Sequence, residues 1–140
     1  MKNIILIAMI FIASANSYGQ AFGVVNNIPG SALQIKVKGQ NFGTACNSSL
    51  SALIPLPFGA SWLMPTPTSA PFVWTPGVVF PFTYDGIYYE VLGPGGILLC
   101  TGTVGKPLCG WVLNQPIPCL PGRFATWIPG AGGAVNVNFH

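Results

Sequence analysis

The sequence predicts an all-β protein, an antiparallel β-sandwich of immunoglobulin-like architecture that is stapled by disulfides. Short segments of strand composition recur along the chain, and turn residues separate them every ~8–12 residues. Outside the N-terminal segment, no window has the 3.6-residue period of an amphipathic helix. A small barrel is the alternative, because it also buries one face of each strand.

The first 19 residues (1–19) have the features of a secretory signal peptide. Lys2 is a short basic region, a ten-residue apolar run follows it, and Ser17 and Gly19 are small residues at the −3 and −1 positions of a cut before Gln20. Ten apolar residues are too few to span a bilayer, which takes about 20. We therefore expect a secreted protein that is extracellular, periplasmic or at the cell surface, with no transmembrane span in the mature chain.

The rest of the chain, residues 20–140, has the length of a single domain. Only 5% of the full sequence is charged, against ~25% in ordinary soluble domains, so part of the surface is expected to face something other than water. The charges that remain after cleavage sum to +2 and belong to Lys36, Lys38, Asp85, Glu90, Lys106 and Arg123. This weak, dispersed charge excludes nucleic acid as an expected partner, since nucleic acid is bound by clustered Lys and Arg.

The clearest strand is residues 32–38, where apolar and polar residues alternate. Side chains of a strand point to opposite faces in turn, so this pattern predicts one buried and one solvated face. A shorter strand is expected before it at residues 23–28. A loop that carries Cys46 is expected after it at residues 39–47.

A run without any charged residue extends from residue 39 to residue 84, a span of 46 positions. Seven prolines interrupt it, and each removes a backbone donor and disfavours helix in the preceding residue. We expect only short extended pieces, at sheet edges or with outward N–H groups, at residues 50–54, 60–64, 72–75 and 78–82.

Residues 86–112 are predicted to form two successive hairpins. The first turn is the Gly-Pro-Gly-Gly cluster at residues 93–96, and the second is expected at residues 104–105. Tyr-Asp-Gly at residues 84–86 is also typical of a turn. Cys119 is placed in a proline-rich loop at 114–122, and the expected strands of this half are residues 87–92, 97–103, 123–128 and 134–140.

Four cysteines in a secreted chain predict two disulfides, which can be connected in three ways. If residues 104–105 are a two-residue hairpin loop, Cys100 and Cys109 lie opposite each other as a non-hydrogen-bonded pair, at the near edge of disulfide geometry. This register favours Cys100–Cys109 with Cys46–Cys119. The rival connectivity is Cys109–Cys119 with Cys46–Cys100.

Few groups could support catalysis, since the mature chain offers only Asp85, Glu90 and His140 as titratable acids or imidazoles. The two carboxylates could form a glycosidase pair, but one lies in the expected turn and the other is expected on a solvated strand face. There is no nucleophile elbow, phosphate loop or Cys-x-x-Cys pair. We therefore expect no enzyme, no cofactor and no metal site.

Aromatic residues are the one feature that could form a ligand site. Tyr88 and Tyr89 are adjacent on a strand, so they point to opposite faces and one of them is expected to face outward. An exposed row of aromatics could stack on sugar rings, whereas buried aromatics would only fill the core. The candidate interface or ligand aromatics are Trp62, Phe72, Trp74, Tyr88 and Tyr89.

Function is expected to depend on association. If the charge-free run faced water, it would form a larger apolar patch than monomers tolerate, so a protein partner or self-association is the expected cover. This favours a non-enzymatic subunit or accessory of an extracellular or cell-surface assembly. The alternatives are a carbohydrate-binding module that uses exposed aromatics, a plain monomer that buries the run, and membrane insertion, for which no segment alternates over a long enough stretch.

Overall fold

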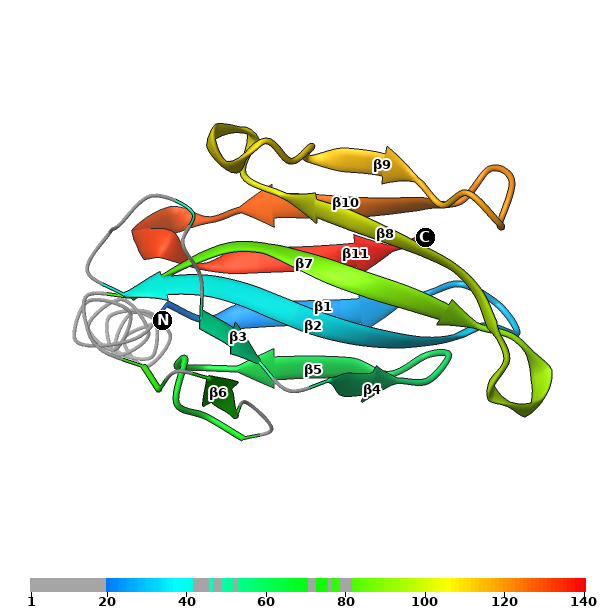
Figure 1. Cartoon of the computed structure of the whole chain (residues 1–140), viewed down its shortest axis with the longest axis horizontal. Coiled ribbons are helices and arrows are strands. Elements are labelled where there is room, and N and C mark those ends of the chain that lie inside the picture. The colour runs from blue at the N-terminus through cyan, green and yellow to red at the C-terminus, as the bar shows by residue number, and fades with distance from the viewer. Residues whose placement is uncertain are drawn as a thin grey trace, which may run out of the picture.

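The computed structural model describes residues 20–41, 46, 49–51, 53–70, 73–75, 77–78 and 82–140. The described residues form two β-sheets that pack face to face (Figure 1). The expected signal peptide at 1–19 and the candidate Phe72 lie outside the described residues, as do parts of the strands expected at 50–54, 72–75 and 78–82.

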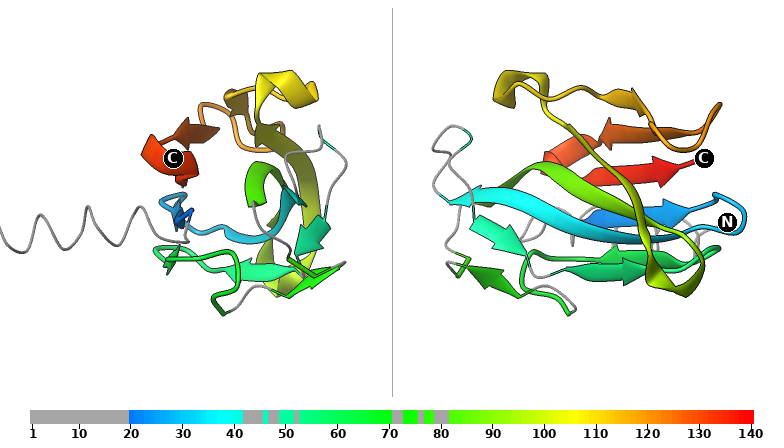
Figure 2. Two further views of the ribbon diagram at one scale, coloured as in Figure 1. Left: turned by 90° about the vertical axis from the view of Figure 1, so that its left-hand side faces the viewer. Right: turned by 45° about the vertical axis from the view of Figure 1, so that its right-hand side comes forward.

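Each sheet contains strands from both halves of the chain. The five-stranded sheet has the order β5 (Ser61–Met64), β1 (Phe22–Asn26), β11 (Val135–Phe139), β10 (Phe124–Pro129) and β9 (Asn114–Pro116). The six-stranded sheet has the order β6 (Trp74–Thr75), β3 (Ser49–Ser51), β2 (Ala32–Asn41), β7 (Phe82–Leu92) and β8 (Leu98–Gly105), with β4 (Ile54–Leu56) also paired to β2. In the left panel of Figure 2, the blue β1 and the red β11 lie on the left, and the olive β8 lies on the right.

The predicted β-sandwich is confirmed, and the immunoglobulin-like detail stays a prediction. The helical turns among the described residues are three short 3-10 turns, η1 (Pro94–Gly96), η2 (Pro107–Cys109) and η3 (Ala131–Gly133). One pairing departs from the antiparallel expectation, because β1 lies parallel to β11. Parallel neighbours need a long crossover, and here nearly the whole chain lies between the two strands.

The core consists of the inward-facing residues of both sheets. On β2, Leu33, Ile35 and Val37 are fully buried, as the alternation predicts. Aromatic rings join the two layers: Phe22 of β1 lies 5.2 Å from the Tyr84 ring of β7. Stabilisation by tilted and edge-on ring pairs adds to the burial of their apolar area.

The chain changes sheets through a turn between β4 and β5, and Asn26 at the end of β1 organises this corner. Its backbone N–H donates to the Ala60 carbonyl (3.0 Å), and its carbonyl accepts from Gly59 (2.8 Å). Its buried side chain donates to the carbonyls of Ser31 (2.9 Å) and Leu56 (3.0 Å). One buried amide therefore satisfies several backbone groups where both sheets meet.

The turn expected at residues 84–86 is wrong. β7 continues through these residues as one strand of 11 residues, and β2 likewise extends to Asn41, beyond the start of the loop expected at 39–47. The register passes from Lys38 opposite Gly86 to Gly39 opposite Tyr84, which leaves Asp85 as an extra, bulged residue. A bulge and a turn share the same short polar residue followed by glycine, so the local sequence does not separate them.

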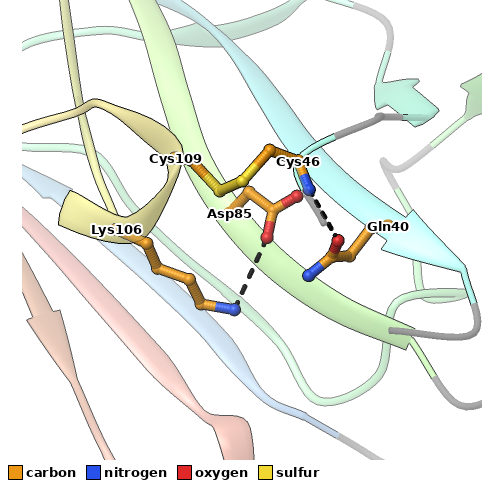
Figure 3. Close-up of a disulfide and its surroundings, with 5 residues drawn as sticks. All are labelled: Gln40, Cys46, Asp85, Lys106 and Cys109. Atoms are coloured by element: carbon orange, nitrogen blue, oxygen red, sulfur yellow. Dashed lines mark hydrogen bonds and ion pairs between the residues drawn. A yellow bond between two sulfur atoms is a disulfide. The ribbon is translucent and has the colours of Figure 1, made fainter. Parts of the chain in front are cut away.

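Both expected disulfide connectivities are wrong. The bonds join Cys46 to Cys109 and Cys100 to Cys119 (Figure 3 shows the first). The reason is that the chain does not reverse at residues 104–105, which are the last two residues of β8.

The reversal lies further along the chain, in η2. Gly105 donates its backbone N–H to the Val112 carbonyl at 2.9 Å, so residues 106–111 form the turn and Cys109 lies inside it. The same register brings Cys100 opposite the segment that contains Cys119. Before it reaches Cys119, the chain leaves β8 and pairs with β10 as β9, which carries it into the other sheet.

Candidate functional site

The two sheets differ in charge. In the strands that the structure describes, the charged residues are Lys36 and Lys38 on β2 and Asp85 and Glu90 on β7, all in the six-stranded sheet. The five strands of the other sheet contain no charged residue. The strands on one broad side of the sandwich are therefore built only from neutral residues.

The outward side of this five-stranded sheet, here called the neutral face, has two rows of side chains across the strands. Their members are cross-strand partners on β5, β1, β11 and β10. Leu63 and Ile128 stand at opposite ends of one row and are 73% and 46% exposed. The first row is Leu63, Gly23, Asn136 and Ile128, and the second is Ser61, Val25, Asn138 and Thr126.

A groove of about 450 Å³ lies on the neutral face. Its lining residues include Gly23, Leu63 and Ile128. A Cβ at position 23 would collide with the side chain of Asn136, so glycine lets this amide lie across β1. The groove thus combines apolar side chains with neutral amides.

Hydrogen bonds on the neutral face connect amide, hydroxyl and imidazole groups. The Thr126 hydroxyl donates to Asn114 Oδ1 at 2.9 Å and lies 3.1 Å from His140 Nε2. Because a hydroxyl has one proton, the His140 Nε2 is the donor in the second bond. Asn27 donates to Asn138 Oδ1 at 3.3 Å, a bond that does not use the Asn138 amino group.

The aromatic candidates are placed in different parts of the molecule. Trp62 on β5 is 40% exposed, borders the groove and donates its indole N–H to the Pro55 carbonyl at 3.2 Å. Trp74 is half-buried against Phe82, with ring centroids 4.9 Å apart. Trp74 belongs to the six-stranded sheet, so it does not extend the groove.

Tyr88 and Tyr89 also belong to the six-stranded sheet, on β7. Tyr89 is fully buried and Tyr88 is half-exposed, which confirms that adjacent residues face opposite sides. The Tyr88 hydroxyl donates to Glu90 at 3.4 Å, and burial raises the pKa of Tyr89 to about 12. Among the described aromatic candidates, Trp62 is the one that contributes to the lining of the groove. It alternates with Ser61 and Leu63, so its indole lies on the opposite side of β5, toward Pro55 of β4.

The titratable groups do not form an acid/base pair. Asp85 is buried, and one carboxylate oxygen lies 3.5 Å from Lys106 Nζ beside the Cys46–Cys109 bond (Figure 3). Burial raises the pKa of Asp85, and the charges of Lys106 and Lys38 lower it in part. Glu90 lies on the half-exposed side with Tyr88. No metal-binding cluster of His, Cys, Asp or Glu occurs among the described residues.

Sequence reasoning missed the groove, although one signal for it exists. In β11 (Val-Asn-Val-Asn-Phe), the outward positions are occupied by asparagine, whereas other strands have charged residues at their outward positions. This pattern predicts that the outward face of β11 is polar but uncharged. The apolar residues Leu63 and Ile128 come from distant segments. Only the strand order brings them into one row.

The comparisons with known proteins add no assignment. The chain matches no protein-family model, no curated protein and no solved structure. Within the part of the chain that the structure describes, no helix is long and apolar enough to cross a membrane. The neutral face and its groove are therefore the features from which a function can be proposed.

Proposed function

We propose that this chain is a secreted, non-enzymatic β-sandwich that acts by association, as a subunit of an extracellular or cell-surface assembly. The observation that supports it is the neutral face, five strands wide and without a charged residue. Secretion follows from the sequence signals, with removal of residues 1–19 before Gln20. The two disulfides are compatible with an oxidising compartment.

The partner that fits this face best is a second copy of the chain. Packing two charged surfaces together requires each charge to be desolvated or paired, and the neutral face avoids both costs. In a two-fold interface the same patch is used twice, so it must be self-complementary. Leu63 and Ile128 project on either side of the groove, so each copy offers apolar ridges and a hollow to receive them.

The test is the oligomeric state of the mature protein and of charge-introducing variants. Leu63→Lys and Ile128→Lys each place a charge on the neutral face, where association would bury it. Leu98→Lys is the matched control, because Leu98 is 52% exposed but lies on β8 in the other sheet. Native mass spectrometry and light scattering over a concentration series should show association for the wild type and Leu98→Lys, and monomers for the two face variants.

Two results would contradict self-association through this face. The first is a wild-type protein that stays a soluble monomer at high concentration. The second is association that survives both face variants. If Leu98→Lys alone abolished association, the interface would instead lie at the edge of the six-stranded sheet.

Carbohydrate binding in the same groove is the second candidate function. It is supported by neutral donors and acceptors on Ser61, Asn136 and Asn138 in the groove, and by the partly exposed Trp62, whose indole lies at the sheet edge beside the groove. Such groups suit uncharged sugar hydroxyls, and an indole can pack against a sugar ring. Titration with neutral polysaccharides, followed by tryptophan fluorescence, should saturate for the wild type and not for Trp62→Ala. No response of the wild type would remove this candidate.

A further inference from the structure

β5 (Ser61–Met64) lies at an edge of the five-stranded sheet, with β1 as its one neighbour among the described strands. A strand edge offers unpaired backbone groups to other chains, and natural proteins protect such edges with prolines, charged residues or covering segments. β5 contains neither a proline nor a charged residue, and Ser61, Trp62 and Leu63 are exposed. This edge is therefore open to pairing.

The other edges of the two sheets are protected in the part of the chain that the structure describes. β4 and β9 each contain a proline, and β6 has only two residues. The outer edge of β8 is covered, because Thr103 donates its backbone N–H to Gln115 Oε1 at 3.1 Å and Gly105 donates to the Val112 carbonyl at 2.9 Å. Among the described edges, β5 is the one without such protection.

The backbone groups of β5 point alternately toward β1 and toward the free edge. Asn26, the last residue of β1, donates its backbone N–H to the Ala60 carbonyl at 3.0 Å. Since this direction alternates along a strand, Trp62 also directs its backbone groups to β1. Ser61 and Leu63 direct theirs outward, and no described residue bonds to these outward groups.

We propose that β5 pairs antiparallel with β5 of a second copy of the chain, around a two-fold axis at Trp62. Ser61 of one copy then lies opposite Leu63 of the other, and each donates its outward N–H to the carbonyl of its partner. An axis at Leu63 would instead place Ser61 opposite Pro65, which has no N–H. An axis at Ser61 would use Gly59, whose N–H already donates to the last carbonyl of β1 at 2.8 Å. The axis at Trp62 is therefore the register that pairs every outward group.

The side chains of β5 suit contact with their own copies. A two-fold axis brings each residue near its counterpart, so a charged residue would meet a like charge, and β5 has none. Trp62 is 40% exposed, and its indole N–H already donates to the Pro55 carbonyl. The two indoles can therefore pack across the axis without leaving a polar group unpaired.

The edge contact rests on the proposed pairing of the neutral face and extends it. A two-fold contact through that face closes after two copies, so a larger assembly needs a second surface. A pair of four-residue strands is weak alone, so we expect the edges to pair between copies that are already held through the neutral face. Each such dimer has two β5 edges with which it can bind further copies.

The size of the assembly tests the edge contact, measured by native mass spectrometry and light scattering over a concentration series. The wild type and Ser61→Ala should form species larger than a dimer, because alanine keeps the outward backbone N–H. Ser61→Pro lacks this N–H and should stop at the dimer. Larger species of Ser61→Pro, or a wild type that stops at the dimer, would overturn the edge contact and leave the face contact intact. A monomeric wild type would overturn both.

Trp62→Cys provides a second measurement that does not depend on a proline in β5. Mild oxidation should link two copies at position 62, because Cα atoms of a non-hydrogen-bonded pair lie about 4.5 Å apart. The side chain at this position points away from the neutral face, so a contact of that face alone does not link it. Phe58→Cys, at a 56% exposed position in the turn before β5, is the control and should stay unlinked. Peptide mapping without reduction identifies the link, and an unlinked Trp62→Cys or equal linking of both variants would overturn the edge contact.

Discussion

Asp85 is the one charged side chain that the described structure buries, at 2% exposure. Two opposing effects act on its carboxyl group. Removal from water favours the neutral form, whereas Lys106 at 3.5 Å and the charge of Lys38 favour the ionised form. Burial is the larger effect, so the pKa of Asp85 is raised above its ordinary value of 3.8.

The sign of the resulting pH dependence follows from this raised pKa. The folded protein binds a proton at Asp85 at a higher pH than the unfolded chain does, so this residue adds to stability as the pH falls toward 3.8 and subtracts from it as the pH rises. We predict that the free energy of unfolding of the wild type, minus that of Asp85→Asn, increases as the pH is lowered from neutral. Urea denaturation at a series of pH values measures this difference.

Glu90→Gln is the control for this measurement, because it removes a carboxylate from a half-exposed position of the same strand. A difference that instead shrinks as the pH falls would mean that the attraction of Lys106 outweighs burial.

The alternation of Tyr88 and Tyr89 could be predicted from sequence, since it needs only the geometry of one strand. The burial of Asp85 could not, because it depends on the partner strand that turns Tyr-Asp-Gly into a bulge.

The η2 segment, residues 106–111, is held against the six-stranded sheet by several contacts. The Trp111 ring covers the cross-strand pair Gly86 and Gly105, where any Cβ would overlap it. Lys38 Nζ lies 5.1 Å from the centre of this ring, within the range of a cation–π interaction. The Cys46–Cys109 bond connects the segment to Cys46, whose backbone N–H donates to the side chain of Gln40 on β2.

The two disulfides should differ in their contribution to stability. The Cys46–Cys109 bond spans 63 residues and the Cys100–Cys119 bond spans 19. On the chain-entropy model their removal should lower the free energy of unfolding by about 4 and about 3 kcal/mol respectively. Chemical denaturation of the paired variants Cys46→Ala/Cys109→Ala and Cys100→Ala/Cys119→Ala measures both losses.

Peptide mapping without reduction checks the connectivity on which this prediction depends. It should recover one peptide pair that contains Cys46 and Cys109, and another that contains Cys100 and Cys119. A Cys100–Cys109 pair would support the hairpin at residues 104–105 and contradict the turn at η2.

The sequence predicts the existence of β7 and β8 well. It does not reveal which residues reverse the chain, because the position of η2 is set by contacts of Trp111 and Lys106 with distant residues of β2 and β7.

At the scale of the molecule, the fold depends on its last strand. β11 lies in the middle of the five-stranded sheet, between β1 and β10, so this sheet cannot close until the end of the chain is in place. The alternation in β11 predicts a half-buried strand, and the structure confirms it. Its central place in the sheet could not be predicted, and for the same reason the neutral face could not be assembled from sequence.

This position of β11 predicts a large difference between two adjacent residues. Val137 is 1% exposed in the core, whereas Asn136 is on the neutral face. Val137→Ala removes two buried methyl groups from between the sheets and should lower the free energy of unfolding by about 2 kcal/mol. Asn136→Ala should change it by less than about 0.5 kcal/mol. Denaturant titrations compare the two, and equal effects would contradict the placement of Val137 between the sheets and of Asn136 on the neutral face, because only a residue packed in the core loses buried contacts on truncation.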